Sequence, residues 1–118
     1  MNYYRIEELF NTIDRMDTPK FVQFLSPDGS FRFGNFPAVI GRADIAQTVE
    51  NFFNSISGLK HTLQDVISSG DKMVVTGQVT YTRKDGSTLT VPFCNVFTLR
   101  GEEIYQYDIY IDISSLYS

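Results

Sequence analysis

Two residue types that build many metal and catalytic sites are nearly missing from this 118-residue sequence. There is one cysteine, Cys94, and one histidine, His61. A lone cysteine excludes an internal disulfide and a cysteine-rich zinc site, and a lone histidine excludes the paired-histidine motif of zinc metalloproteases. The sequence also lacks a glycine-rich phosphate loop, a nucleophile-elbow serine and a dinucleotide-binding fingerprint. We therefore expect neither a metal nor a cofactor.

Basic residues are in the minority and form no cluster. Ten Lys and Arg residues stand against fourteen Asp and Glu residues, which gives a net charge of −4. Nucleic acids and anionic membrane surfaces are bound through basic patches, so this balance argues against both partners. The first ten residues include Arg5, Glu7 and Glu8, unlike a signal peptide or a membrane span. The sequence predicts a cytoplasmic protein.

What is present suits a single domain. Hydrophobic residues make up 42% of the chain and charged residues 20%, an ordinary globular composition. A chain of this length can bury one core but has no room for a second. No repeat, linker or low-complexity tract interrupts it, so we expect one domain over residues 1–118.

The first half of the chain has the period of helices. Apolar residues recur every three or four positions from Ile6 to Met16, which predicts a helix with one buried face. Thr18 and Pro19 are typical of an N-cap and first helical position. Glycine and proline mark the turns between elements. The expected elements are helices over 6–16, 18–25 and 41–57, a turn over 26–29 and a short strand over 31–33.

The second half changes to the alternating period of strands. Four extended runs rich in Val, Thr, Ile, Tyr and Phe cover residues 61–68, 72–83, 88–100 and 103–113. The dipeptide Asp85-Gly86 is a strong signal for a two-residue hairpin turn, and weaker signals separate the other runs. These runs predict an antiparallel meander.

Five short sequence motifs, spaced between residues 31 and 112, are informative through their order and spacing. They are Phe31–Asn35, Gly41–Ile45, Leu59–His61, Val91–Phe93 and Ile109–Asp112. With three helices followed by a long sheet, they resemble the SnoaL-like branch of the nuclear transport factor 2-like superfold, which includes ketosteroid isomerase, limonene epoxide hydrolase and polyketide cyclases. The resemblance implies an α+β, cone-shaped fold in which helices close over a curved, mainly antiparallel sheet. It also implies a homodimer through the outer sheet face, but little about chemistry.

Alternation along the strands assigns residues to two sheet faces. With two-residue turns at Asp85-Gly86 and Gly101-Glu102, one face is almost wholly apolar or aromatic. Such a face suits a cavity for a small apolar or aromatic molecule, whereas the mixed face suits the outside. A β-bulge would exchange the faces of a strand. The ligand-binding residues expected on the cavity face are Val79, Tyr81, Cys94, Val96, Tyr105, Tyr107 and Ile109.

Three residues are candidates for acid/base chemistry. A three-residue turn at 69–71 places His61 and Asp65 on the cavity face, with Cα atoms about 13 Å apart, which suits the two ends of a ligand. The alternative is a strand-end histidine with a solvated aspartate. Asp108 is the third candidate, because with Tyr110 it would supply a base and an oxyanion donor if the register shifted.

Comparison with two enzymes of the superfold argues against two specific activities for this chain. Ketosteroid isomerase carries its base on the short strand before the third helix, where residues 31–33 here offer no carboxylate. Limonene epoxide hydrolase has a final-strand aspartate where this chain has Ile109. The leading hypothesis is therefore a protein that binds a small, largely apolar molecule. The alternatives are an acid/base isomerase, cyclase or hydratase, and a non-catalytic protein-interaction domain.

Overall fold

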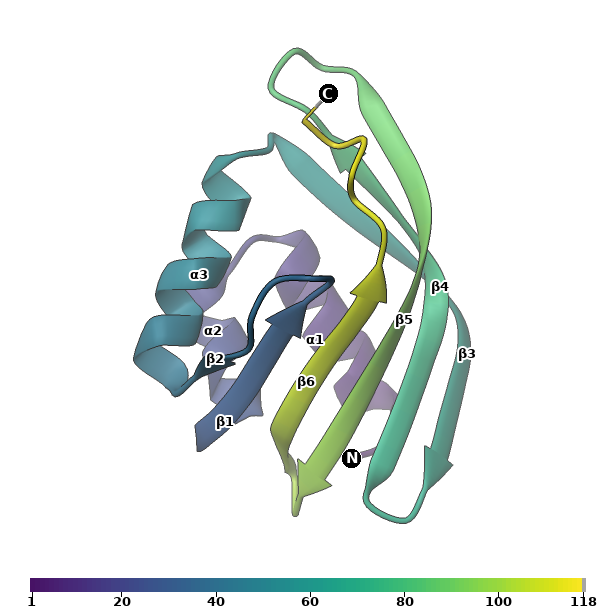
Figure 1. Cartoon of the computed structure of the whole chain (residues 1–118). Coiled ribbons are helices and arrows are strands. Elements are labelled where there is room, and N and C mark those ends of the chain that lie inside the picture. The colour runs from purple at the N-terminus through teal and green to yellow at the C-terminus, as the bar shows by residue number, and fades with distance from the viewer. Residues whose placement is uncertain (118) are drawn as a thin grey trace.

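A computed structural model describes residues 1–117 as three helices and a 3-10 turn packed on one sheet (Figure 1). The Asn2 side chain accepts a hydrogen bond from the Arg5 amide and so begins the first helix, while Asp17 does the same for the second. The predicted apolar stripe is buried from Ile6 to Ile13, but the first helix ends at Asp14, so Met16 lies beyond it and is half-buried. The helical elements are α1 (Tyr3–Asp14), α2 (Thr18–Phe21), η1 (Val22–Phe24) and α3 (Arg42–Asn54).

Six strands form the sheet in the order β2-β1-β6-β5-β4-β3. Neighbouring strands are antiparallel except β1 and β6, which are parallel. This confirms the expected α+β class with a mainly antiparallel sheet. The strands are β1 (Leu25–Phe33), β2 (Val39–Ile40), β3 (Gly58–Ser69), β4 (Lys72–Thr82), β5 (Thr88–Arg100) and β6 (Glu103–Ile111).

The first strand is longer than expected. Residues 26–29, expected to form a turn, belong to β1. The pairing of β1 with β6 shifts between Leu25 and Ser30, and β2 pairs only with Ser30 and Phe31. Pro27, which has no amide hydrogen, therefore lies outside both ladders, which explains how a turn-like sequence is accommodated in a strand.

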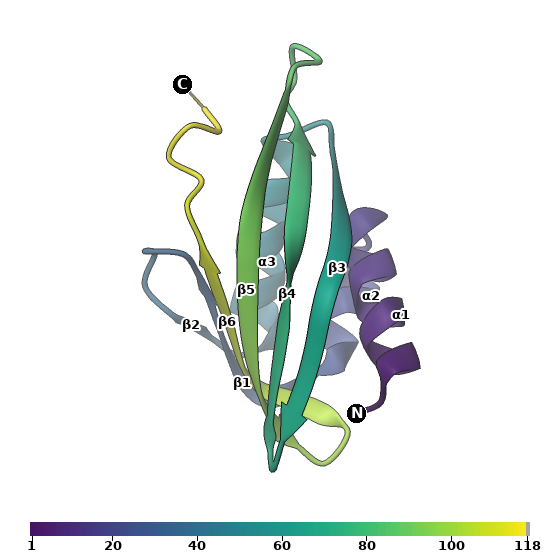
Figure 2. The ribbon, with the colours of Figure 1, turned by 90° about the vertical axis from the view of Figure 1, so that its right-hand side faces the viewer.

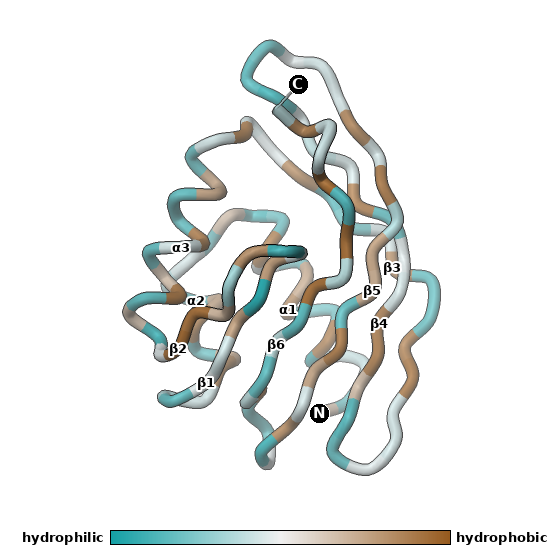
Figure 3. The backbone as a smooth tube through the Cα atoms, viewed as in Figure 1, coloured by the Kyte–Doolittle hydropathy of each residue, from teal (hydrophilic) through white to brown (hydrophobic). Residues whose placement is uncertain are grey.

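All helices cover the same, concave face of the sheet. Seen from the side, the outer face of β3, β4 and β5 has no helix in front of it (Figure 2). Brown apolar positions are interspersed along these strands, whereas the loop between β4 and β5 is hydrophilic (Figure 3). No helix within residues 1–117 is long and apolar enough to span a bilayer.

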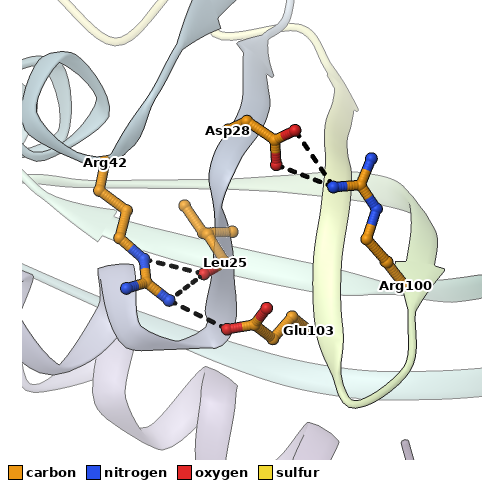
Figure 4. A network of polar contacts seen from close by, with 5 residues as sticks. All are labelled: Leu25, Asp28, Arg42, Arg100 and Glu103. Atoms are coloured by element: carbon orange, nitrogen blue, oxygen red, sulfur yellow. Dashed lines mark hydrogen bonds and ion pairs between the residues drawn. The ribbon is translucent and has the colours of Figure 1, made fainter.

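Arginine side chains tie the edges of this arrangement together (Figure 4). The Arg42 guanidinium, at the start of α3, donates to the Leu25 carbonyl through Nε at 2.9 Å and pairs with Glu103 of β6 at 3.1 Å. The Arg100 guanidinium of β5 contacts both carboxylate oxygens of Asp28 at 3.0 and 3.1 Å. The Arg42 contacts fix α3 relative to β1 and β6, the Arg100 contacts join β5 to β1, and together they fix one wall of the space between helices and sheet.

Three local irregularities decide which side chains face the helices. The connection between β4 and β5 spans residues 83–87 instead of a two-residue turn, because Thr82 pairs with Thr88. Tyr105 is an extra residue between the pairs Leu99–Ile104 and Thr98–Gln106. Residue 64 of β3 is also extra, because the pairing of β3 with β4 shifts between Leu63 and Asp65. The turn between these two strands contains only residues 70 and 71, one fewer than expected. Each irregularity moves a strand by one residue, which exchanges its two faces.

Candidate functional site

A cavity of about 450 Å³ lies between the helices and the concave face of the sheet. Its walls come from α1, α2, α3, β1, the loop after β1 and the inner faces of β3 to β6. Most of the lining is aromatic or aliphatic, and no Lys, Arg, Asp or Glu of residues 1–117 contributes to it. Aromatic rings on the walls include Phe31, Phe33, Phe52, Phe53 and Phe93.

His61 contributes an imidazole to the cavity lining, and an imidazole nitrogen can accept or donate a proton. Asp14, the last residue of α1, holds it at two points. One carboxylate oxygen contacts His61 Nδ1 at 2.6 Å, and the other accepts from the His61 backbone amide at 3.0 Å. A carboxylate only accepts hydrogen bonds, so Nδ1 must carry the hydrogen and donate it. The neutral ring therefore has its lone pair on Nε2.

Aromatic packing fixes the plane of the His61 ring. Phe10 and Phe93 meet it edge to face, with ring centroids 4.9 and 5.2 Å away. Within residues 1–117, no atom hydrogen-bonds to Nε2. The imidazole is thus oriented by Asp14 and two rings while its second nitrogen stays available.

Asn95 and Tyr107 form a second polar pair on the cavity lining. The Asn95 residue is 2% exposed, and its Oδ1 has no hydrogen-bond partner in the described chain. The Tyr107 ring packs against Phe21, Phe31 and Phe97, with centroids 5.5, 5.3 and 4.5 Å away. Such a pair is unusual in an otherwise apolar wall, because buried polar groups normally find partners.

Two tyrosines present neutral hydroxyls to this space. Burial raises the pKa of Tyr107 far above its ordinary value, and the charges of Tyr81 and Asp14 raise it further, while the neighbouring Asn95 amide opposes this. Burial is also the main cause of the raised pKa of Tyr81, whose ring meets Phe52 edge to face. Both phenols therefore remain protonated hydrogen-bond donors at neutral pH.

A family model described as a SnoaL-like domain matches residues 6–107 of the chain. The chain belongs to the SnoaL-like family. No curated protein is similar enough in sequence to match it.

Solved structures share the fold of this SnoaL-like chain at low sequence identity. A protein of unknown function from Burkholderia pseudomallei is 18% identical, with 96% of this chain and 92% of that one covered and a TM-score of 0.86. A hypothetical protein with a ketosteroid isomerase-like fold from Catenulispora acidiphila, in complex with trimethylamine, is 17% identical, with coverages of 98% and 90% and a TM-score of 0.87. TerC, co-crystallised with polyporic acid, is 19% identical, with coverages of 97% and 93% and a TM-score of 0.83.

The expected ligand-binding residues of the SnoaL-like chain divide between the two faces. Three line the cavity and a fourth is buried on the same face: Tyr81, Tyr107, Ile109 and Val79, respectively. The placement of Cys94 and Val96 is wrong, because the longer β4–β5 loop turns them outward and turns Phe93, Asn95 and Phe97 inward. Tyr105 occupies the bulge, where its ring lies 3.9 Å from the Arg100 guanidinium carbon.

The three catalytic candidates do not come together. His61 lines the cavity, but Asp65 lies beyond the β3 bulge on the outer face and accepts from the Thr76 hydroxyl at 3.2 Å. Asp108 pairs across from Val96 and also faces outward, as does Tyr110. The expectation that His61 and Asp65 share the cavity face is therefore wrong, and the carboxylate that contacts the histidine is that of Asp14.

The sequence contained signals for both missed residues. Asp14 follows Phe10 by four positions, so it is a carboxylate on the apolar stripe of the first helix. Asn95 lies midway between Phe93 and Phe97, an amide among aromatic residues at strand spacing. A polar residue at a position where the periodicity demands an apolar one was the informative feature in each case.

Proposed function

We propose that this SnoaL-like protein binds a small, neutral, largely apolar molecule in the cavity. The observation that carries the proposal is the cavity itself, whose volume lies within the range of small-molecule sites and whose walls are rich in aromatic rings. Charged ligands are disfavoured, since no charged side chain of the described residues lines it. The ligands seen with TerC and with the Catenulispora protein support a role in small-molecule binding.

Binding is tested with 2-methoxynaphthalene, a neutral aromatic probe, by isothermal titration calorimetry. Ile109→Trp fills the cavity with a large ring, whereas Thr90→Trp adds the same ring on the exposed side of β5. We expect saturable binding to the wild type and to Thr90→Trp and none to Ile109→Trp. Equal binding by all three proteins would contradict a site inside the cavity.

A second function is favoured by the clamp of Asp14 on His61. We propose that Nε2 of His61 acts as a general base that takes a proton from the bound molecule and returns it at another position. Asp14 keeps the ring in the reactive tautomer and stabilises the imidazolium while it holds the proton. Such an isomerisation balances without any cofactor, because the proton removed is the proton returned. The clamp of Asp14 on His61 supports the isomerase alternative.

Proton transfer is measured as deuterium incorporation into 2-tetralone, an enolisable aromatic ketone, by proton NMR in D₂O. We expect the wild type to accelerate exchange at the carbons beside the carbonyl. His61→Gln should slow this exchange by about a hundredfold or more, which is the usual effect of removing a general base. Asp14→Asn should slow the exchange by a smaller factor. If His61→Gln catalysed exchange at the wild-type rate, the proposal that His61 is the general base would be contradicted, whereas the binding proposal would be unaffected.

The outer face of the sheet is proposed as the contact of a homodimer. Its side chains include Ile67 and Tyr110, which are 56% and 61% exposed, and Val74, Cys94 and Val96 are half-buried beside them. Apolar side chains on a face that no helix covers are typical of subunit contacts. Sedimentation equilibrium should give a dimer for the wild type and a monomer for Val96→Asp. A monomeric wild type at micromolar concentration would contradict this proposal.

A further inference from the structure

Asn95 is a buried polar residue in the largely apolar wall of the cavity. It lies on the inner face of β5 between two buried phenylalanines, and it is 2% exposed. Oδ1 has no hydrogen-bond partner among residues 1–117. A buried acceptor without a partner destabilises the protein, so a residue of this kind at a cavity points to a partner supplied from outside. The last torsion of asparagine is soft, which lets the amide turn toward a ligand.

Tyr107 supplies the complementary half of the pair. Its hydroxyl lies beside the Asn95 amide on the cavity lining, and, against the larger effect of burial, the hydrogen bond between the two side chains lowers the pKa of Tyr107, as expected where the phenol oxygen accepts from the amide. The phenol is neutral and so has one hydrogen to donate. Asn95 Oδ1 and Tyr107 Oη together present one acceptor and one donor to whatever occupies the cavity.

We propose that the molecule bound in the cavity carries a hydroxyl group, phenolic or enolic, that donates to Asn95 Oδ1 and accepts from the Tyr107 hydroxyl. This inference rests on the proposed binding function. A carbonyl accepts but does not donate, so it would leave Oδ1 unpaired, and an ether would do the same. A carboxylate finds no Lys or Arg among the described lining residues to balance its charge. A hydroxyl on a flat apolar frame satisfies both atoms.

The position of the pair sets the shape of that molecule. Asn95 follows Phe93 by two residues on the same face of β5, a distance of about 7 Å along the strand. The Phe93 ring in turn contacts the His61 imidazole. The hydroxyl end and the base thus lie on opposite sides of Phe93, and the apolar frame spans this ring. A substrate that reaches both is a ring compound with its hydroxyl at one end and its labile proton at the other.

The experiment compares 2-naphthol with 2-methoxynaphthalene, which has the same frame but no hydrogen to donate. Dissociation constants are measured by calorimetry for the wild type, Asn95→Leu and Asn54→Leu, the last being an exposed asparagine on α3 outside the cavity lining. We expect the wild type and Asn54→Leu to prefer 2-naphthol by about tenfold, the ratio that one hydrogen bond to a buried partner supplies. Asn95→Leu should bind both probes equally.

The outcomes separate this inference from the proposed function. Equal affinity of the wild type for the two probes would contradict the proposed ligand hydroxyl but not the proposed binding of an apolar molecule. Binding of neither probe would contradict both proposals. A tenfold preference that persists in Asn95→Leu would overturn the role of Asn95. The wild-type comparison needs no variant, so it decides the question even if Asn95→Leu does not fold.

Discussion

The two buried tyrosines predict a loss of stability in alkali that can be worked out in advance. The pKa of each phenol is raised by burial above the ordinary value of 10.0. Above pH 10 the unfolded chain releases these protons while the folded chain keeps them. The folded state then binds more protons than the unfolded state, so the free energy of unfolding falls as pH rises.

The magnitude follows from the two titrations. Between pH 9 and pH 11, ionisation in the unfolded state lowers the free energy of unfolding by about 1.4 kcal/mol for each tyrosine that stays neutral when folded. Tyr81 and Tyr107 together contribute about 3 kcal/mol. Phenylalanine has no proton to lose, so Tyr81→Phe or Tyr107→Phe should each remove about half of this pH dependence, whatever its effect on stability at neutral pH.

The assay is urea unfolding at pH 9 and pH 11, followed by circular dichroism. Tyr4→Phe serves as the control, because the Tyr4 side chain is 80% exposed and its phenol is not buried on folding. Contributions from lysines and from the other tyrosines cancel in the comparison between variants. If the free energy of unfolding fell as much between pH 9 and pH 11 in Tyr107→Phe as in the wild type, the claim that Tyr107 stays neutral in the folded protein would be refuted.

Three further predictions concern the scaffold. Gly77→Ala should lower the free energy of unfolding by about 3 kcal/mol in chemical denaturation, because a Cβ there would lie 2.1 Å from the Thr62 carbonyl oxygen and backbone cannot move aside; a stability equal to the wild type would contradict the close approach of the two strands. In Asp14→Asn the side chain has one acceptor oxygen in place of two, so it cannot accept from both the His61 amide and His61 Nδ1. Nitrogen NMR of the single histidine should then show a smaller population of the Nδ1–H tautomer than in the wild type. An unchanged spectrum would contradict the proposed clamp. Arg42→Met should cost about 1–2 kcal/mol in the same denaturation assay, since it leaves a β1 carbonyl without its donor, and an unchanged midpoint would count against this bridge.

Much of the fold could be predicted from periodicity. The change from a helical to a strand period near residue 58 placed three helices before four long strands, and the structure has these elements in that order, with β1 and β2 between α2 and α3. The stripe from Ile6 to Ile13 is buried as predicted. These features are local, because they depend only on which residues recur at 3.6 or 2 positions.

The faces of the strands could be predicted only in part. Tyr107 and Ile109 were placed correctly, but two compensating shifts lay behind that result: one in the β4–β5 loop and one at Tyr105. Asp85-Gly86 has the composition of a two-residue turn, yet the loop is longer and is closed by a hydrogen bond from the Arg83 amide to the Ser87 carbonyl. Bulges and loop lengths depend on how distant segments pack, which short-range sequence patterns do not contain.

The site was harder to foresee because its members lie far apart in the chain. Asp14 and His61 are separated by 47 positions and meet only because α1 packs across β3. The isolated Gly77 within a strand was a usable hint of close backbone approach, and it lies opposite the β3 bulge that separates His61 from Asp65. Chemistry assembled by packing leaves only such indirect marks in the sequence.

The bulge at Tyr105 also bears on how such a cavity can change over evolutionary time. Residues of β6 after Tyr105 are in phase with β5 only because of that one extra residue. If Tyr105 paired with Thr98 in a regular ladder instead, Asp108 would lie across from Asn95, and Asp108 and Tyr110 would face the cavity in place of Tyr107 and Ile109. An apolar wall would then carry a carboxylate without the exchange of a single side chain. In a sheet with a binding site on one face, the gain or loss of one bulge is therefore a route to new specificity as direct as substitution.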